Sequence, residues 1–342
     1  MTHDPSRSPV PPSGESVPKK PESGSLPGAE SPHTGPTSRS GADSVFSPGG
    51  KCTEKTGKRF TSPAGIGLIG NPIGHSLSPA LFREYFASRP DILRQWSYDL
   101  IERDSFDEAW NAFLQDYAAV NVTAPFKENA FRAADSHDYS ALRCRASNLL
   151  VKTPDEGVKA YNTDFEAVLE IIQQELQLTA ATEKAERRKV LVIGAGGAGK
   201  AATAAAIEAG MQVSLCNRTV SRAQEFADYL LGYDPHGRGS VTRVIRTDLY
   251  SAILDAGIII YTLPGPSDIL THLLSSAPDI FSGKIVLEAN YKDPVLASVP
   301  CRRYISGLTW LRLQAIATYR IVITGRRPSR PDAVPDGGRR SG

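Results

Sequence analysis

The sequence predicts an α/β fold of two domains, the second of which is a Rossmann-like, doubly wound sheet. Three observations support this prediction. The composition changes sharply near residue 60, short apolar strands alternate with amphipathic helices from there onward, and a glycine-rich turn joins an apolar strand to an alanine-rich helix. Because strand–helix–strand crossovers are right-handed, this order builds a parallel sheet with helices on both faces.

Residues 1–60 form a tail in which Pro, Ser and Gly dominate the composition. Large apolar side chains are almost absent, so burial cannot offset the entropy lost on ordering, and we expect disorder. An organelle transit peptide is rich in Arg and poor in acidic residues, whereas this segment contains several Asp and Glu residues. We therefore expect a non-catalytic tail, followed at the other end of the chain by a shorter disordered tail at 329–342.

Charge and cysteine content exclude several classes of protein. The net charge is +2, without the clustered basic residues that nucleic-acid and membrane surfaces usually require. No apolar run approaches the ~18 residues of a membrane-spanning helix. The four cysteines lie far apart and match neither a disulfide framework nor a zinc site. We expect a cytoplasmic protein, a monomer or homodimer, that binds a small molecule and no nucleic acid, membrane or metal.

The first domain is expected at 61–164 and begins with a buried strand at 65–70, bounded by Gly and Pro. Ser78 is the predicted N-cap of the next helix, with Pro79 at its first position. The same patterns predict a strand at 118–122, a helix at 127–134 and a long connecting helix at 164–178.

The second domain is expected at 165–305, and its first strand, 189–193, is apolar throughout, as in parallel sheets. Helices at 306–328 are expected to complete the first domain. The remaining elements of the second domain are helices at 201–209 and 221–231 and strands at 212–216, 257–261 and 284–288.

A glycine-rich turn at 194–199 lies directly between an apolar strand and a helix. Glycine is needed there because side chains would keep the backbone away from a pyrophosphate, which the amides at the helix N-terminus bind. Such a motif alone is weak, but the strand before it, the helix after it and a second strand about 20 residues later strengthen it. The candidate dinucleotide contacts are Gly194, Gly196, Gly197 and Ala198.

The residues after the second strand of this domain indicate which dinucleotide is bound. An enzyme selective for NAD usually carries an acidic residue there for the ribose 2′-hydroxyl. This sequence instead has Asn217, Arg218, Thr219 and Arg222. Guanidinium groups match phosphate geometry, so the cluster favours a 2′-phosphate and predicts NADP as the cofactor.

Small polar residues gather at the ends of strands in the first domain. They occur in the blocks Gly-His-Ser-Leu-Ser-Pro at 74–79, Asn-Val-Thr-Ala-Pro-Phe-Lys at 121–127, Ala-Ser-Asn at 146–148 and Asn-Thr-Asp at 162–164. Hydroxyls and amides with one Lys and one Asp suit a polyhydroxylated, anionic small molecule.

At these residues the chain resembles the shikimate dehydrogenase family. The resemblance covers most of 64–328 and keeps the family's order through the serine pair, the Asn-Val-Thr-x-Pro-x-Lys block, the Asn-Thr-Asp block, the glycine-rich loop, the Asn-Arg-Thr-x-x-Arg block and a late Gln. It implies reversible NADPH-dependent reduction of 3-dehydroshikimate to shikimate, in the biosynthesis of aromatic amino acids.

The resemblance also implies roles for individual residues. Lys127 and Asp164 would flank the reacting ketone or hydroxyl as catalytic residues, and this role agrees with the need for a proton and a nearby positive charge where hydride delivery forms an alkoxide. The residues that match the family's substrate contacts are Ser76 and Ser78 for the carboxylate, Thr123, Asn148 and Gln314 for the ring hydroxyls, and Tyr291 nearby.

The chain departs from the family pattern in its second half. Tyr261-Thr262-Leu263-Pro264 stands where Asn-Ala-Thr-Pro is frequent, and Trp310 stands where Met is common. We expect the indole of Trp310 to narrow the pocket near the nicotinamide. Two alternatives are an NAD-dependent quinate or quinate/shikimate dehydrogenase and a retired, ligand-sensing homologue. The basic cluster and the serine pair count against the first, and the presence of both Lys127 and Asp164 counts against the second.

Overall fold

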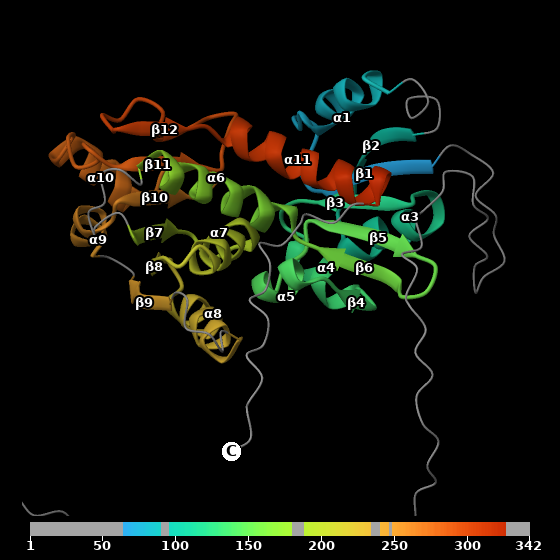
Figure 1. Ribbon diagram of the computed structural model, residues 1–342, viewed down its shortest axis with the longest axis horizontal. Helices are drawn as coiled ribbons and strands as arrows, with labels where there is room; N and C mark the ends of the chain where they lie inside the picture. Colours follow the sequence, from blue (N-terminus) through green and yellow to red (C-terminus); the bar gives the residue numbers. More distant parts are fainter. Residues whose placement is uncertain (1–63, 90–95, 180–187, 234–239, 246–247, 326–342) are drawn as a thin grey trace, which may run out of the picture. The chain divides into compact units, whose positions relative to one another are not determined.

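The computed structural model describes residues 64–89, 96–179, 188–233, 240–245 and 248–325. The tails predicted at 1–60 and 329–342 lie outside the described residues, as does Cys52. Two six-stranded sheets contain the described strands, and helices pack against both sheets. The predicted α/β fold with a Rossmann-like second sheet is confirmed (Figure 1).

The first sheet is mixed and has the strand order β2-β1-β3-β5-β6-β4. β1 pairs in parallel with β2 and β3, whereas β5 runs antiparallel to both β3 and β6. Its strands are β1 (Ala64–Gly70), β2 (Trp96–Glu102), β3 (Ala119–Val122), β4 (Ser136–His137), β5 (Leu149–Thr153) and β6 (Gly157–Tyr161). Its accompanying helices are α1 (Ser78–Ala87), α3 (Phe106–Asp116), α4 (Lys127–Ala133) and α5 (Tyr139–Cys144).

The second sheet is parallel throughout and has the order β12-β11-β10-β7-β8-β9. The chain therefore reverses its direction of winding between β7 and β10, and in open α/β sheets ligands bind beside this switch point. Its strands are β7 (Lys189–Ile193), β8 (Gln212–Cys216), β9 (Ser240–Ile245), β10 (Ile258–Tyr261), β11 (Ile285–Glu288) and β12 (Arg303–Ile305). Its helices are α7 (Gly197–Glu208), α8 (Val220–Tyr233), α9 (Leu249–Asp255) and α10 (Asp268–Ser276).

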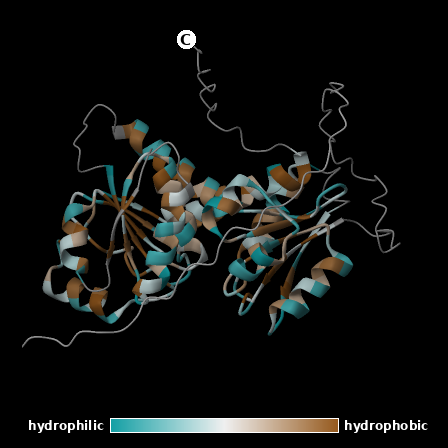
Figure 2. Cartoon of the chain, turned by 90° about the horizontal axis from the view of Figure 1, so that it is seen from below, coloured by the Kyte–Doolittle hydropathy of each residue, from teal (hydrophilic) through white to brown (hydrophobic). Residues whose placement is uncertain are grey.

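Figure 2 shows that many strands of both sheets are hydrophobic and that many helices are hydrophilic on one side. This pattern follows from burial, because β3, β10 and β11 are buried along their whole length. Helix α7 differs, since alanines at positions 201, 202, 204, 205 and 206 are fully buried. Its small side chains allow it to pack closely against both β7 and α6 (Thr163–Thr179).

Two long helices connect the sheets. Helix α6 leads from β6 toward β7, and α11 (Gly307–Thr324) leads from β12 back to the first sheet, where it packs against α1 and α6. The sequence predicted several helices at 306–328, but the described part of this segment is a single helix that ends at Gly325, whose φ of +64° is a left-handed C-cap. No helix among the described residues is both long enough and apolar enough to cross a membrane.

The start of α1 differs from the sequence prediction. Ser78 is the first residue of the helix and not its N-cap, which is Leu77. The reason is local hydrogen bonding. The backbone N–H of Ser78 donates to the Ser76 hydroxyl at 3.2 Å, and the buried Ser78 hydroxyl accepts a hydrogen bond from the Ser76 hydroxyl at 3.2 Å instead of capping the helix.

The first sheet should depend on Phe82 of α1, which is fully buried and stacks on Tyr98 with ring centroids 4.2 Å apart. We expect Phe82→Ala to lower the free energy of unfolding by about 3–5 kcal/mol, since it removes a large buried ring and leaves a cavity. Urea denaturation followed by circular dichroism measures this change. Tyr250→Ala, a matched truncation at a ring that is 50% exposed, should cost no more than about 1 kcal/mol. Equal losses for the two variants would contradict the packing described here.

Candidate active site

A cavity of about 930 Å³ is lined by residues from the carboxyl ends of strands in both sheets. In the first sheet, its lining residues follow β1, β3 and β6, and Asn148 lies directly before the antiparallel strand β5. In the second sheet, they follow β7, β8, β10 and β11. The switch point between β7 and β10 therefore opens into it. The volume suits a small ligand together with the reactive part of a dinucleotide.

The cavity brings together most of the site residues predicted from the sequence. Arg218 and Thr219 are not among its lining: both are exposed, and the carbonyl oxygen of Thr219 accepts a hydrogen bond from Asn217 Nδ2 at 2.8 Å. The predicted residues that do line it are Ser76, Ser78, Thr123, Lys127, Asn148, Asp164, Gly194, Gly196, Gly197, Ala198, Asn217, Arg222, Tyr291 and Gln314.

Lys127 and Asp164 form a nearly buried ion pair in this cavity. The Nζ of Lys127 lies 2.5 Å from Oδ2 of Asp164, and the two side chains are 15% and 9% exposed. Lys127 is the first residue of α4, and Asp164 lies in the first turn of α6. Asp164 therefore lies near the positive end of the α6 dipole.

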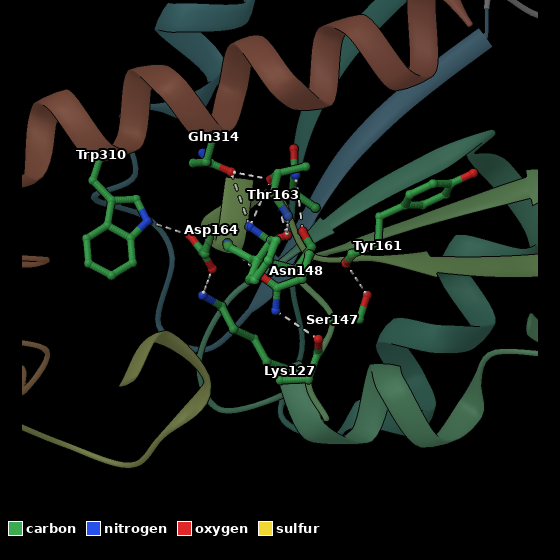
Figure 3. A network of polar contacts seen from close by, with 12 residues as sticks. Lys127, Ser147, Asn148, Tyr161, Thr163, Asp164, Trp310 and Gln314 are labelled. Atoms are coloured by element: carbon green, nitrogen blue, oxygen red, sulfur yellow. Dashed lines mark hydrogen bonds and ion pairs between the residues drawn. The ribbon is translucent and has the colours of Figure 1, made fainter. Parts of the chain in front are cut away.

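Asp164 does not cap α6. The side-chain oxygen of Asn162 accepts a hydrogen bond from the backbone N–H of Phe165 at 3.0 Å and so satisfies the helix N-terminus. The Asp164 carboxylate is therefore available for other contacts. Its second oxygen, Oδ1, accepts a hydrogen bond from the indole Nε1 of Trp310 at 3.0 Å (Figure 3). Trp310 lines the cavity, and the contact with Asp164 was not anticipated from the sequence.

A buried polar network lies next to the ion pair (Figure 3). Asn148 Nδ2 donates to Thr163 Oγ1 at 3.0 Å and lies 3.4 Å from Gln314 Oε1, while the backbone N–H of Thr163 donates to Asn148 Oδ1 at 2.6 Å. Asn121 continues the network, since its Nδ2 donates to Thr318 Oγ1 at 3.0 Å. These bonds fix the amide orientations of the predicted ring-hydroxyl contacts before any ligand binds.

The serine pair lies in a setting of neutral donors. Ser76 and Ser78 approach each other at 3.2 Å, and Tyr98, which donates to Asn121 Oδ1 at 3.0 Å, is close to Ser78. Burial raises the pKa of Tyr98, so its phenol remains a protonated donor near neutral pH. Hydroxyl groups of this kind can hydrogen-bond a carboxylate without burying a full positive charge beside it.

The glycine-rich loop has the geometry of a phosphate cradle. Gly194 has a φ of +110°, which side chains rarely adopt, and a Cβ at Gly199 would lie 2.0 Å from the carbonyl oxygen of Gly194. A Cβ at Gly196 would meet open space, so the backbone there is accessible to a ligand. Glycine is required at position 197 for a different reason: a Cβ there would lie 2.7 Å from Cδ of Lys127.

The predicted basic cluster has an acidic partner that the sequence analysis did not identify. Glu128 Oε1 accepts hydrogen bonds from Lys200 Nζ at 2.9 Å and from Arg222 Nη2 at 3.3 Å. Burial pushes the pKa of Glu128 upward, but Lys200, with smaller contributions from Arg222 and Arg132, outweighs it and holds the pKa below its usual value. Sequence position alone gave no signal for this contact, since Glu128 and Lys200 are on separate helices.

The departure at 261–264 changes the wall of the cavity and not its polar centre. Tyr261 points away into the core, where its hydroxyl donates to the carbonyl oxygen of Gly265 at 2.6 Å. Burial, with Glu288 nearby, raises the pKa of Tyr261 to about 12, so the phenol is neutral. The residues that follow it, Thr262, Leu263 and Pro264, line the cavity.

The described residues contain no group of three or more His, Cys, Asp or Glu side chains placed to hold a metal ion. Three cysteines, Cys144, Cys216 and Cys301, are among the described residues. Cys144 and Cys216 are buried, and burial raises the pKa of both thiols, to about 11 for Cys216. They are therefore protonated near neutral pH and unreactive as nucleophiles.

Comparisons with known proteins show which family the chain belongs to. The model of the shikimate dehydrogenase substrate-binding domain matches residues 68–150, and the model of shikimate/quinate 5-dehydrogenase matches residues 176–272. The shikimate dehydrogenase (NADP(+)) of Vibrio campbellii is 31% identical over 222 residues, which are 64% of this chain and 76% of the relative. That of Caulobacter vibrioides is 33% identical over 282 residues, which are 77% of this chain and 90% of the relative.

Solved structures show the same fold. The shikimate dehydrogenase of Mycobacterium tuberculosis is 25% identical with a TM-score of 0.59, over 75% of this chain and 93% of that chain. The quinate dehydrogenase of Corynebacterium glutamicum in complex with NAD, at 19% identity and a TM-score of 0.61 over 78% of this chain and 96% of that chain, shares the fold alone. On its sequence matches, its topology and its cavity, the chain belongs to the shikimate dehydrogenase family.

Proposed function

We propose that the protein is a shikimate dehydrogenase, which catalyses the reversible NADPH-dependent reduction of 3-dehydroshikimate to shikimate in the biosynthesis of aromatic amino acids. The observation that carries this proposal is the Lys127–Asp164 ion pair, which lines the same cavity as the glycine-rich loop. A proton donor and a dinucleotide cradle in one cavity are what carbonyl reduction by a nicotinamide requires.

NADPH fits the residues on the second sheet. The open space at Gly196 and the N-terminus of α7 would receive the pyrophosphate, and Arg222, with Arg218 nearby in sequence, would receive the 2′-phosphate. No acidic residue follows β8 to favour a free 2′-hydroxyl. The relatives named as NADP(+)-dependent support the same cofactor. The chemistry that the bound cofactor supplies is a hydride.

Lys127 is the proposed proton donor. As hydride reaches the ring ketone, its oxygen becomes an alkoxide, and a proton from Nζ of Lys127 completes the hydroxyl; in the reverse direction Nζ receives that proton. Before the transfer the ammonium stabilises the negative charge that develops on this oxygen. Asp164, 2.5 Å away, holds Nζ in place, and the neighbouring main chain holds the lysine, since Ser147 N–H donates to its carbonyl oxygen at 2.9 Å.

The substrate contacts follow from the polar groups around this pair. Ser76 and Ser78 are the proposed partners of the carboxylate, and Thr123, Asn148 and Gln314 those of the ring hydroxyls, with Tyr291 at the cavity wall. These assignments are supported because all of these side chains line one cavity. For Asn148 and Gln314, hydrogen bonds in the polar network also fix the orientation of the side chains.

We further propose that the first sheet with α11 is the substrate domain, and that the second sheet is the cofactor domain. The sequence bounds of 61–164 and 165–305 lie close to the ends of the two sheets at Tyr161 and Ile305. The cytoplasmic location and the monomeric or homodimeric state stay predictions.

The reaction is tested by recording absorbance at the nicotinamide band with each pair of substrates. The purified full chain should oxidise shikimate with NADP, and it should be slower with quinate and slower with NAD. No turnover of shikimate with NADP would refute the proposal. Faster oxidation of quinate with NAD would assign the protein to the quinate branch of the family instead.

Lys127→Ala should lower kcat by about 10²–10⁴-fold, because general acid–base catalysis contributes about that factor. Steady-state kinetics with shikimate and NADP measures the change. Lys159→Ala is the control: Lys159 is another lysine held by a carboxylate, Glu156, at 2.6 Å, but it does not line this cavity. A loss of less than about 10-fold for Lys127→Ala would rule out its role as proton donor.

Arg222→Ala should raise the KM for NADP by about 10-fold or more and leave the KM for NAD almost unchanged, since a charge-assisted hydrogen bond to the 2′-phosphate is lost. Steady-state kinetics with varied NADP and varied NAD measures both KM values. Arg302→Ala, which alters an exposed arginine outside the cavity, should change neither constant. Equal weakening of NADP and NAD binding would mean that Arg222 does not recognise the 2′-phosphate.

A further inference from the structure

The indole of Trp310 is directed at the ion pair from a third helix. Trp310 is 4% exposed, and its Nε1 donates to Oδ1 of Asp164 at 3.0 Å, while Lys127 holds Oδ2 of the same carboxylate (Figure 3). Each carboxylate oxygen thus has its own donor, and the two donors are on different helices, α4 and α11. This arrangement fixes both the position and the rotation of the carboxylate.

The start of α11, which carries Trp310, is held in place by a cap and by close contact with the chain after β11. The Ser306 hydroxyl caps the helix by accepting a hydrogen bond from the Leu308 N–H at 3.2 Å. Gly307 lies so close to the chain after β11 that a Cβ on it would be 2.5 Å from the carbonyl oxygen of Ala289. Gln314 lies one turn after Trp310, on the same face of the helix, and contacts Asn148 and Thr163.

An indole N–H suits this task for a chemical reason. It can donate but not accept, and it keeps its hydrogen at every working pH, so it always offers a donor to Oδ1 of Asp164. Without this donor, one oxygen of the buried carboxylate would have no partner, and the group would be free to rotate away from Lys127. Lys127 on α4 is the charged partner of Asp164, and the buried thiol of Cys144 on α5 lies within electrostatic range of the Asp164 carboxylate.

We propose that Trp310 is a positioning residue, whose indole N–H holds the Asp164 carboxylate in the orientation that keeps the Lys127 ammonium at the reacting oxygen. Trp310 acts through Asp164 and takes no part in proton or hydride transfer. Its role in turnover rests on the proposed function, whereas the hydrogen bond itself can be tested without activity.

The activity test is a double-mutant cycle between positions 310 and 164. Trp310→Phe keeps an aromatic ring and removes the donor, and we expect kcat to fall about 10-fold, as for loss of one hydrogen bond to a charged group, with the KM for NADP changed less than about 2-fold. In an Asp164→Ala background the same substitution should change kcat less than about 2-fold, because no carboxylate remains to be positioned. A full 10-fold loss in that background would overturn the proposal.

Two further proteins separate the donor from the bulk of the ring. Replacing Trp310 by 3-benzothienylalanine, in which sulfur takes the place of the indole N–H at nearly the same shape, should reproduce the loss of kcat. Trp96→Phe is the matched control, since Trp96 is also buried but its Nε1 has no partner among the described residues, and it should leave kcat unchanged. Normal kcat in the benzothienyl protein would show that only the shape of the ring matters and would refute the role of the N–H.

The hydrogen bond itself can be observed by NMR of the full chain with ¹⁵N-labelled indole groups. The chain has three Trp residues, so three indole N–H signals are expected, and the one absent from Trp310→Phe belongs to Trp310. This signal should move upfield in Asp164→Ala while the other two stay in place. An unmoved signal would contradict the inference. If the wild-type chain lacked activity but the signal moved, the proposed function would fail and the contact would stand.

Discussion

Asp164 is a buried negative charge, and the contacts around it show how this charge is accommodated. An isolated carboxylate in such a place would be costly, and loss of one partner of a buried pair leaves an uncompensated charge. Here Lys127 supplies the opposite charge, the N-terminus of α6 supplies a favourable dipole, and Trp310 donates a hydrogen bond. Because these partners come from α4, α6 and α11, the site can form only when all three helices are packed together.

The packing of α11 shows why a helix so late in the chain belongs to the first sheet. Thr318 is fully buried and accepts a hydrogen bond from Asn121 at the end of β3, while Gln314 contacts Asn148 at the start of β5. Each buried polar group in such a network needs a hydrogen-bond partner. The network therefore specifies one arrangement of α11 over the first sheet. The same arrangement carries Trp310 to Asp164.

Much of this was readable in the sequence, because glycine-rich turns and strand-end motifs have local causes. The cradle at Gly194–Gly199 and the pairing of strands around it follow from the residues nearby. The partners of Asp164 and Glu128 could not be predicted in this way. Trp310 is distant in sequence from Asp164, and Arg222 from Glu128, so both contacts depend on helix packing that no local pattern encodes. At Ser78 a local rule was wrong: the sequence predicted Ser78 as the N-cap of α1, but its backbone N–H bonds the Ser76 hydroxyl and the N-cap is Leu77.

The close approach of Gly197 to the side chain of Lys127 means that the two domains are not interchangeable modules. The first turn of α7 contacts the aliphatic part of the Lys127 side chain. A change in either one, or its replacement by that of a relative, therefore requires a matching change in the other. A chimera that joins this first sheet to a foreign dinucleotide domain would retain every residue of the ion pair. Its activity would depend on whether the glycine-rich loop of the foreign domain leaves space for the side chain of Lys127, as the absent Cβ of Gly197 does here.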